Sequence, residues 1–325
     1  YSWVVADLHG HVFDIPFVLT ILAVLLALLA RSERPATHDV PTHVQISKNF
    51  FSSLFSSLKT FWYLPLLGFF LSVMYMTNAW DGLIYLLLSG LFILYMHATS
   101  FAKKHNVGFS MIVNLEFISS LAIAAVAIFL GFLFFSLPFS LFFKPFVSGI
   151  GVLCAPEALV NKGMLGPFLF EADHCQRSPW WQLLTLYGFF YFFIFAFLGF
   201  LTRVKNVRIS DTFVLLLIIL GTVLIIIPEF IYVKDIYPAH YRANTMFKLV
   251  FQSFILLSIA SSYAIVRILS SIRSRKLHLL EKIPTVLFIL ITLIFLVLVF
   301  IYPFQAINSY YGELKKYAGL DGTKY

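Results

Sequence analysis

Long apolar runs recur along the whole chain. A helix needs about 20 apolar residues to cross the hydrocarbon core of a bilayer, and eight segments approach or exceed that length. They lie near residues 13–30, 60–77, 83–101, 109–137, 183–202, 212–232, 249–270 and 284–304. The runs are continuous rather than alternating, which favours helices over the strands of a membrane barrel. The pattern predicts an all-α polytopic transmembrane bundle of about eight spans.

The composition indicates the same solvent. Of the 325 residues, 60% are hydrophobic and 12% are charged, and the mean hydropathy is +0.91. So little polar surface cannot cover a soluble globule of this size, and we expect lipid to cover it. The net charge of +8 does not indicate nucleic acid, because Lys and Arg in cytoplasmic loops produce such a charge in membrane proteins. The expected partner is membrane lipid, and the sequence identifies no protein partner.

The basic residues are unevenly divided between the two sides of the predicted bundle. The loops after the first, third, fifth and seventh spans hold thirteen cations against four acids, whereas the other loops and the chain ends hold nine cations against ten acids. The thirteen are Arg31, Arg34, Lys48, Lys103, Lys104, Arg203, Lys205, Arg208, Arg267, Arg273, Arg275, Lys276 and Lys282. Because basic loops stay in the cytoplasm, the polar clusters of the other side are predicted to be extracytoplasmic.

The predicted organisation is a transmembrane domain over residues 1–305 with an outer loop at 138–182. An outer tail at 306–325 is expected to lead to a further C-terminal part, and the chain is expected to begin within a longer protein. The loop holds a short helix signal and a Trp pair at its return to the membrane, which fit either a lid over a site or a segment lying on the lipid surface. Cys154 and Cys175 share this loop, and whether they pair is left open.

The first polar cluster contains two acids and two imidazoles. In a helix, Asp7, His11 and Asp14 share one face, with His9 nearby. Carboxylate and imidazole together can ligate a divalent metal such as Mg, Mn or Zn, hold a phosphate, or act as base and acid. The alternative is a helix start in which Asp7 or Asp14 caps the backbone ahead of Pro16.

The second cluster, Thr-Asn-Ala-Trp-Asp, occupies the turn between the second and third spans. Asn78 and Asp81 flank Trp80, which fits either a supporting role in a site or a solvated turn with an interfacial aromatic residue and a helix cap.

The third cluster, between residues 229 and 248, holds the most varied set of polar groups. Its members are Glu229, Lys234, Asp235, His240, Arg242, Asn244, Thr245 and Lys248. Arg242 offers a bidentate fork and Lys248 a point charge for a phosphate. Both share a face with Thr245 if the seventh span starts early, which would aim a positive helix end at the same anion. The alternative is an interfacial network of salt bridges.

Three polar residues fall within the spans themselves. Asn114 and Glu116 lie near the cytoplasmic end of the fourth span and His97 near that of the third. Intramembrane ionisable groups suggest transport, but these lie within snorkelling distance of the interface.

Four ordered motifs carry a family resemblance: DLHGHV with IPF, then TNAWD, then the residues of 229–248, and finally GLDG at 319–322. In this order they resemble the Chlor-Arch-YYY membrane proteins of bacteria and archaea, a family of unknown function that is itself similar to the GT-C glycosyltransferases. The resemblance implies a multi-pass protein of the plasma (inner) membrane. It also implies an extracytoplasmic site that uses a polyprenyl-phosphate-linked sugar, with carboxylates as base or metal ligand and later cations on the lipid phosphate.

These observations lead to a glycosyltransferase hypothesis, specifically a hexosyltransferase. Arg242 and Lys248 would grip the donor phosphate with His9, His11 and His240. Asp7 and Asp235 would be catalytic, positioning a metal, a proton or the acceptor hydroxyl. The supporting residues would be Asn78, Asp81, Glu229, Asn244 and Thr245, and the candidate metal ligands Asp7, His11 and Asp14. The alternatives are a transporter or flippase of lipid-linked or anionic solutes, which needs polar groups at the bilayer midplane, and a non-catalytic scaffold for envelope assembly.

Overall fold

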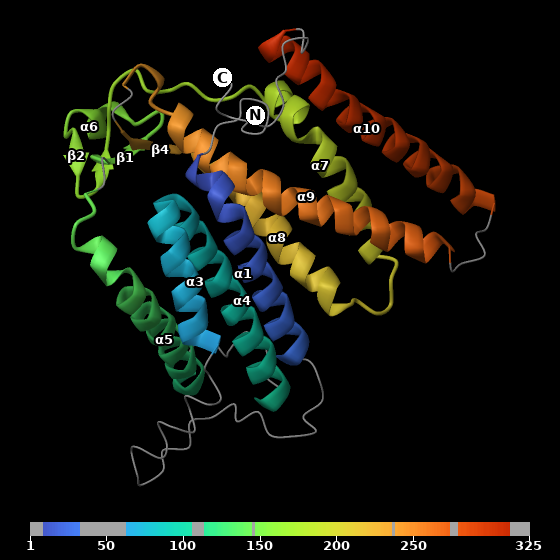
Figure 1. The fold of residues 1–325 in the computed structure, drawn as a ribbon, viewed down its shortest axis with the longest axis horizontal. Coiled ribbons are helices and arrows are strands. Elements are labelled where there is room, and N and C mark those ends of the chain that lie inside the picture. Colours follow the sequence, from blue (N-terminus) through green and yellow to red (C-terminus); the bar gives the residue numbers. More distant parts are fainter. Residues whose placement is uncertain are drawn as a thin grey trace, which may run out of the picture.

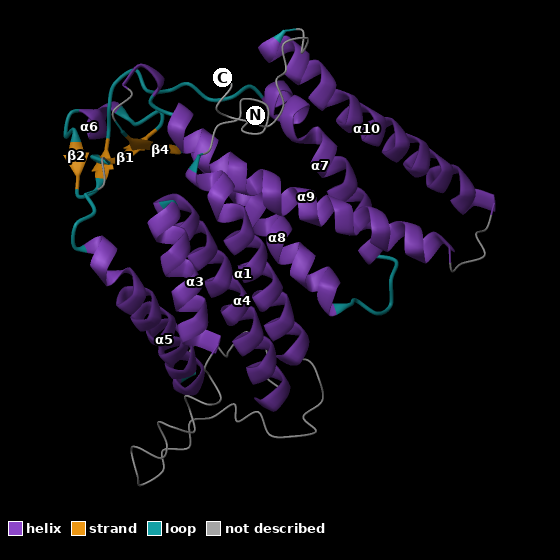
Figure 2. Cartoon of the chain, in the orientation of Figure 1, coloured by secondary structure: helices purple, strands orange, loops and turns teal. Residues whose placement is uncertain are grey.

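The computed structural model describes residues 9–32, 63–105, 114–144, 147–235, 238–273 and 279–312. Within them the fold is a bundle of long helices with a small sheet at one end (Figures 1 and 2). The long helices are α1 (Gly10–Ser32), α3 (Tyr63–Thr77), α4 (Ala79–His105), α5 (Leu115–Ser140), α7 (Trp180–Leu201), α8 (Ile209–Ile226), α9 (Ala243–Arg273) and α10 (Leu279–Tyr311). Seven are long and apolar enough to cross a membrane, and α3 is a shorter apolar helix. The prediction of an all-α polytopic bundle is confirmed.

Three helix boundaries differ from the predicted spans. Helix α9 begins at Ala243, six residues before the predicted start, because its first turns carry polar side chains that a hydropathy window rejects. Helix α8 ends at Ile226 and continues as the 3₁₀ turn η2 (Ile227–Glu229), where Pro228 lacks the N–H for a further α-helical bond. Helix α10 runs on to Tyr311, so the expected boundary at residue 305 falls inside a helix.

The helices pack through a continuous apolar core formed mainly by α1, α3, α4, α7, α8 and α9. Helices α3 and α5 approach backbone to backbone: a Cβ on Gly68 would lie 2.5 Å from the carbonyl oxygen of Ile128, and one on Gly131 would lie 2.9 Å from that of Pro65. Helix α10 lies at the edge of the bundle and touches α7 through rings such as Phe288 and Phe192 (Figure 1). Most of its other large side chains are exposed, as expected for a helix covered by lipid.

The predicted outer loop forms most of a four-stranded sheet, which neither interpretation of that loop anticipated. Its strands are β1 (Gly149–Val152), β2 (Met164–Leu165), β3 (Phe168–Leu169) and β4 (Ile231–Lys234), in the order β2-β3-β1-β4, and the one-turn helix α6 (Glu157–Val160) lies between β1 and β2. Strand β1 is parallel to β3 and antiparallel to β4. The sheet therefore joins the chain that follows α5 to the chain that precedes α9.

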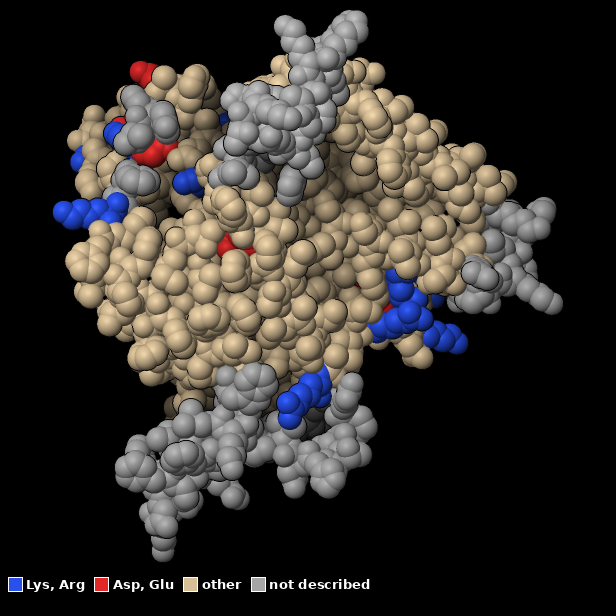
Figure 3. Space-filling model, in the orientation of Figure 1, with Lys and Arg blue, Asp and Glu red and all other residues tan. Residues whose placement is uncertain are grey.

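A disulfide between Cys154 and Cys175 closes the sheet region, which settles the pairing that the sequence left open. We call the end of the bundle that carries the sheet the sheet end, and the other the opposite end. Figure 3 shows charged side chains gathered at these two ends, with an almost uncharged band between them on this face. Exposed Arg31, Arg203 and Lys205 lie at the opposite end.

Candidate functional site

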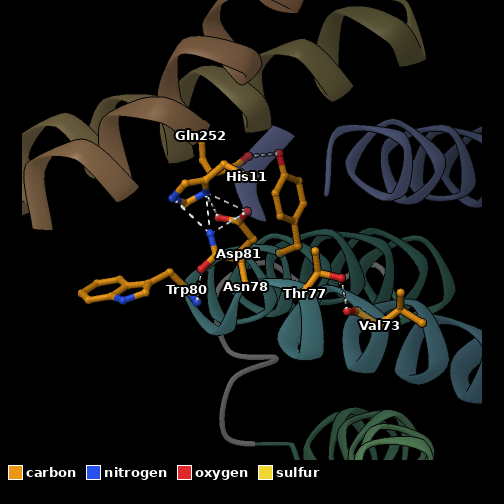
Figure 4. A network of polar contacts seen from close by, with 8 residues as sticks. His11, Val73, Thr77, Asn78, Trp80, Asp81 and Gln252 are labelled. Atoms are coloured by element: carbon orange, nitrogen blue, oxygen red, sulfur yellow. Dashed lines mark hydrogen bonds and ion pairs between the residues drawn. The ribbon is translucent and has the colours of Figure 1, made fainter. Parts of the chain in front are cut away.

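The centre of the candidate site is a buried pair between His11, in the first turn of α1, and Asp81, in the first turn of α4. Nδ1 of His11 lies 2.9 and 3.0 Å from the two carboxylate oxygens of Asp81, and neither side chain is exposed. Figure 4 shows the imidazole above the carboxylate. The pair therefore joins two clusters that are 70 residues apart in the sequence.

Asn78, the single residue between α3 and α4, also belongs to this network. Its amide nitrogen lies 2.6 and 3.0 Å from Nδ1 and Nε2 of His11 and 3.3 Å from Oδ2 of Asp81. A consistent arrangement has His11 donating from Nδ1 to Asp81 and accepting at Nε2 from Asn78. The side-chain oxygen of Asn78 also accepts a hydrogen bond from the backbone N–H of Trp80 at 3.3 Å. The Trp80 ring points away from the network (Figure 4).

Asp14 lies one turn after His11 on the same buried face of α1. The side chain is fully buried, and neither oxygen accepts a hydrogen bond from an N–H or O–H group of the described residues. The neighbour of its carboxyl is the carboxyl of Asp81, with which it can share a proton in a hydrogen bond. Because Asp14 lies inside α1 rather than before it, the helix-cap interpretation of this residue is wrong. A buried carboxyl without a donor is costly, so Asp14 is suited to bind a proton or a ligand group.

Aromatic rings from α9 cover the imidazoles. The His11 ring stacks on Phe251 with centroids 5.0 Å apart and meets Phe247 edge-on at 5.5 Å. The ring of His9 stacks on that of His11 at 5.0 Å. The next residue of α9 after Phe251, Gln252, accepts a 3.0 Å hydrogen bond from the buried hydroxyl of Tyr85. Helix α9 thus forms the wall of the site opposite α4.

Lys248 is the cation associated with this network. Its ammonium lies 5.4 Å from the centre of the Trp80 ring, and its charge interacts with the carboxylates of Asp81 and Asp235. Asp235 in turn accepts a 2.7 Å hydrogen bond from Asn244. Lys248 is half-buried, so its charge is screened less than that of a surface lysine.

Arg242 is bound to other partners. It pairs with Glu229 at 2.6 Å and donates to the carbonyl oxygen of Gln176, and both charged side chains are largely buried. Glu229 also accepts from the backbone N–H and the hydroxyl of Ser178, at 2.7 and 2.8 Å. Thr245 accepts from the backbone N–H of Val233 at 2.9 Å. The predicted shared anion face of Arg242, Thr245 and Lys248 is therefore divided among three separate sets of contacts.

A further ionic cluster lies in the sheet. Glu171 accepts 2.5 Å hydrogen bonds from Lys234 and from the hydroxyl of Tyr232. Burial raises the pKa of Glu171, but these hydrogen bonds and the charge of Lys234 outweigh it and hold that pKa below its ordinary value. Burial, the hydrogen bond to Glu171 and its charge raise the pKa of Tyr232. These residues tie β4 to the chain that follows β3.

The most completely bonded buried ion pair lies at the opposite end. Arg267 of α9 binds both carboxylate oxygens of Asp211 of α8, at 3.0 and 3.2 Å. Asp211 also accepts from the hydroxyl of Tyr263 and the backbone N–H of Arg208, at 2.7 and 2.8 Å. Arg267 was predicted to lie in a loop but lies inside α9, and Asp211 lies in the first turn of α8. Asp211 directly precedes the predicted span 212–232, and Arg267 lies near the end of the predicted span 249–270. These positions were the sequence signal for an ion pair between the two helices.

The remaining predicted residues lie elsewhere or outside the described residues. His240 is exposed on the 3₁₀ turn η3 (Pro238–His240). Asn114 caps α5 by accepting from the backbone N–H of Glu116 at 2.9 Å, and Nδ1 of His97 lies 2.9 Å from the carbonyl oxygen of Ile93. Asp7 lies outside the described residues.

The expected metal site is not formed by the described part of the chain. No group of three His, Cys, Asp or Glu side chains there is arranged to hold a metal ion. Both ring nitrogens of His11 face Asp81 and Asn78, and Asp7 is not described. Because Asp7 lies outside the described residues, a metal bound by Asp7, His11 and Asp14 stays a prediction.

These features define a polytopic helical membrane protein with a buried polar network near one end of its bundle. The chain belongs to the family of uncharacterised membrane proteins DUF2298, whose model matches residues 1–211 and 199–257. It matches no curated protein and no solved structure. The expectation of an uncharacterised membrane family is confirmed at this level.

Proposed function

We propose that this protein is a membrane-embedded transferase that moves a sugar from a polyprenyl-phosphate donor to an acceptor at the sheet end. The observation that carries the proposal is the fully buried group of His11, Asp14 and Asp81 with Lys248 beside it. Placing an ionisable side chain inside a membrane span costs free energy, and such residues usually serve a function. A lipid-linked donor reaches such a site from the bilayer, which suits a cluster enclosed by helices.

The proposed chemistry divides between the cation and the acids. The bond between the sugar C1 and the phosphate oxygen breaks, and its electron pair stays on the phosphate. The acceptor oxygen forms the new bond to C1 and loses its proton. Lys248 stabilises the charge that grows on the phosphate. Asp14 takes the proton, because its carboxyl faces the carboxyl of Asp81 and no N–H or hydroxyl group of the described residues donates to it.

The other candidate residues receive supporting roles. Asp81 and Asn78 orient His11 beside Asp14, and Asp235 with Asn244 positions Lys248. Arg242 and Glu229 hold the start of α9, so we assign Arg242 as a positioning residue rather than as a direct phosphate ligand. Asp7 keeps its proposed role near the acceptor.

Two observations support an extracytoplasmic position of this site. Disulfides persist in oxidising compartments, and Cys154–Cys175 lies at the sheet end. Exposed basic residues such as Arg203, Lys205 and Arg208 lie at the opposite end, as the positive-inside tendency expects for a cytoplasmic face. The proposal therefore places the reaction on the outer face of a plasma membrane.

The test uses the full chain in proteoliposomes with polyprenyl-phosphate hexoses as donors, and measures the polyprenyl phosphate released and the glycosylated product. Asp14→Asn should still bind polyprenyl phosphate but lose about 100-fold or more in turnover. Lys248→Ala should weaken that binding about tenfold, whereas Lys248→Arg should retain much of it. Lys162→Ala, an exposed lysine of the sheet region, is the matched control and should change neither.

The alternatives give different results in the same vesicles. Flux of the lipid-linked sugar across the bilayer without a covalent product would favour a flippase. Turnover that is unchanged in both Asp14→Asn and Lys248→Ala would contradict the assignment of this site.

A further inference from the structure

An exposed apolar patch lies where the sheet meets the helices. Leu141 and Phe142, at the end of α5, are 70% and 84% exposed. Leu165 and Phe168, which pair across the β2–β3 hairpin, are 46% and 43% exposed, and the neighbouring Met164 is 54% exposed. Neither the core of the bundle nor the proposed reaction uses these side chains.

The hairpin is tight, and its shape follows from its sequence. Leu165 pairs with Phe168, which leaves Gly166 and Pro167 as a two-residue turn. Gly166 has φ +58, a conformation that glycine adopts without strain, and Pro167 fixes the next φ. A glycine followed by a residue with negative φ is the type II′ pattern that suits a two-residue hairpin. The two flanking apolar side chains are therefore held at the tip.

Strand directions show which way this tip points. Strand β1 begins nine residues after the end of α5, and its arrow runs away from the helices (Figure 2). Strand β3 is parallel to β1, so the turn that precedes β3 lies at the helix side of the sheet. The backbone N–H of Ile150 donates to the carbonyl oxygen of Pro167 at 2.8 Å, which places Pro167 beside the start of β1. Lys234 pairs with Gly149 at the same side, just before the chain returns to α9.

The other side of the sheet region is polar. The chain passes from β1 to α6, which begins with the exposed Glu157, and then through the exposed Asn161 and Lys162 before β2 begins. The region thus has exposed apolar side chains at the hairpin tip toward the helix ends and exposed polar side chains around α6.

We propose that the β2–β3 hairpin is a membrane-docking element whose tip inserts into the headgroup region of the bilayer that the helices span. The occupant of the apolar patch is lipid, because Leu141 and Phe142 directly follow the membrane-spanning α5, where Phe134 and Leu137 are also 73% and 44% exposed. Exposed Lys144 follows α5 directly, at a position where a cation meets lipid phosphates. Apolar residues of such elements are buried about 5–10 Å into the boundary between headgroups and acyl chains.

The chain allows a direct test because its two cysteines are paired with each other. Leu165→Cys is labelled with an environment-sensitive fluorophore without reductant, and the full chain is placed in nanodiscs. Lipids with a spin label near the headgroup should quench this fluorophore severalfold more than one at Glu157→Cys on α6. Leu141→Cys, at the end of α5, is the reference for a site at the membrane surface.

The outcomes separate lipid from other occupants. Strong quenching by spin-labelled lipid together with weak quenching by aqueous iodide supports the proposal. Quenching at Leu165→Cys no greater than at Glu157→Cys would overturn it. Protection from both quenchers would also overturn it and would indicate that a second copy of the chain covers the tip. In nanodiscs that hold a single copy, this protection would disappear. Retained thermal stability of the labelled variant shows that the fold is intact.

Discussion

Asp14 and Asp211 are both fully buried aspartates near the ends of membrane-spanning helices, yet their surroundings are opposite. Asp211 is held by a guanidinium, a hydroxyl and a backbone N–H. Asp14 accepts from no donor of the described residues. A completely bonded buried charge is a structural element, whereas an incompletely bonded one needs a separate explanation. The contrast is consistent with a structural role for the pair at the opposite end and with the proposed function of the group at the sheet end.

The largest expected effect comes from breaking the bonded pair. Arg267→Ala leaves the Asp211 carboxylate buried without its cation and should lower the free energy of unfolding by about 3–5 kcal/mol. Thermal or denaturant unfolding of the purified protein in detergent measures it. The double variant Asp211→Leu with Arg267→Met should lose less than the single variant, because no unpaired charge remains. If Arg267→Ala and the double variant lose the same free energy of unfolding, the charge of the pair does not account for its effect on stability.

Removing the cation that holds α9 should have a smaller effect. Arg242→Ala leaves Glu229 with only its two hydrogen bonds from Ser178, and should lower the free energy of unfolding by about 2–3 kcal/mol. The exposed Arg203 offers a matched control, since Arg203→Ala should change it by less than about 0.5 kcal/mol. Equal effects of the two substitutions would show that Arg242 is not a structural clamp.

Neutralising Asp14 sharpens the comparison directly. Asp14→Asn replaces a buried carboxyl beside Asp81 with an amide of the same size that can donate to the Asp81 carboxylate, so the free energy of unfolding should stay within about 1 kcal/mol of the wild type or rise. Asp211→Asn should lose more, because it weakens three charge-assisted hydrogen bonds. Unfolding curves recorded side by side give the answer, and a larger loss for Asp14→Asn would reverse our reading of the two sites.

The smallest effect is a pH dependence of the sheet. Folding lowers the pKa of Glu171, so its stabilisation is present above the ordinary value of 4.5 and is lost as the pH falls from there through the folded value. Glu171 is partly exposed, so the contribution should be below about 1 kcal/mol. Glu171→Gln should lose less stability than the wild type between neutral and acidic pH, with Glu157→Gln as the control. Parallel pH profiles of wild type and Glu171→Gln would contradict it.

The helices of the bundle were predictable because lipid imposes one simple requirement, a long apolar run with all backbone groups bonded internally. The sheet was not, because strands of two to four residues such as Met164–Leu165 are too short to show an alternating pattern. Helix α9 starts before its apolar run because Asn244, Thr245 and Lys248 each have partners in the folded chain.

The candidate site was predictable in its parts but not in its assembly. The residues around His11 and those around Asn78 were each selected from local sequence. Their contact depends on how α1 packs beside the α3–α4 turn, which no local pattern encodes. The pairing of Arg242 with Glu229 instead of a ligand was foreseen only as the alternative network of salt bridges.

The single-residue link at Asn78 limits how this half of the site can move. Helices α3 and α4 are in direct contact beside the link, since a Cβ on Gly82 would lie 2.8 Å from the Cα of Tyr75. Asn78 and Asp81 therefore travel together as one rigid block. Under the proposed function, an opening that admits the donor would come from displacement of α1 or α9, so spectroscopic probes belong on those two helices.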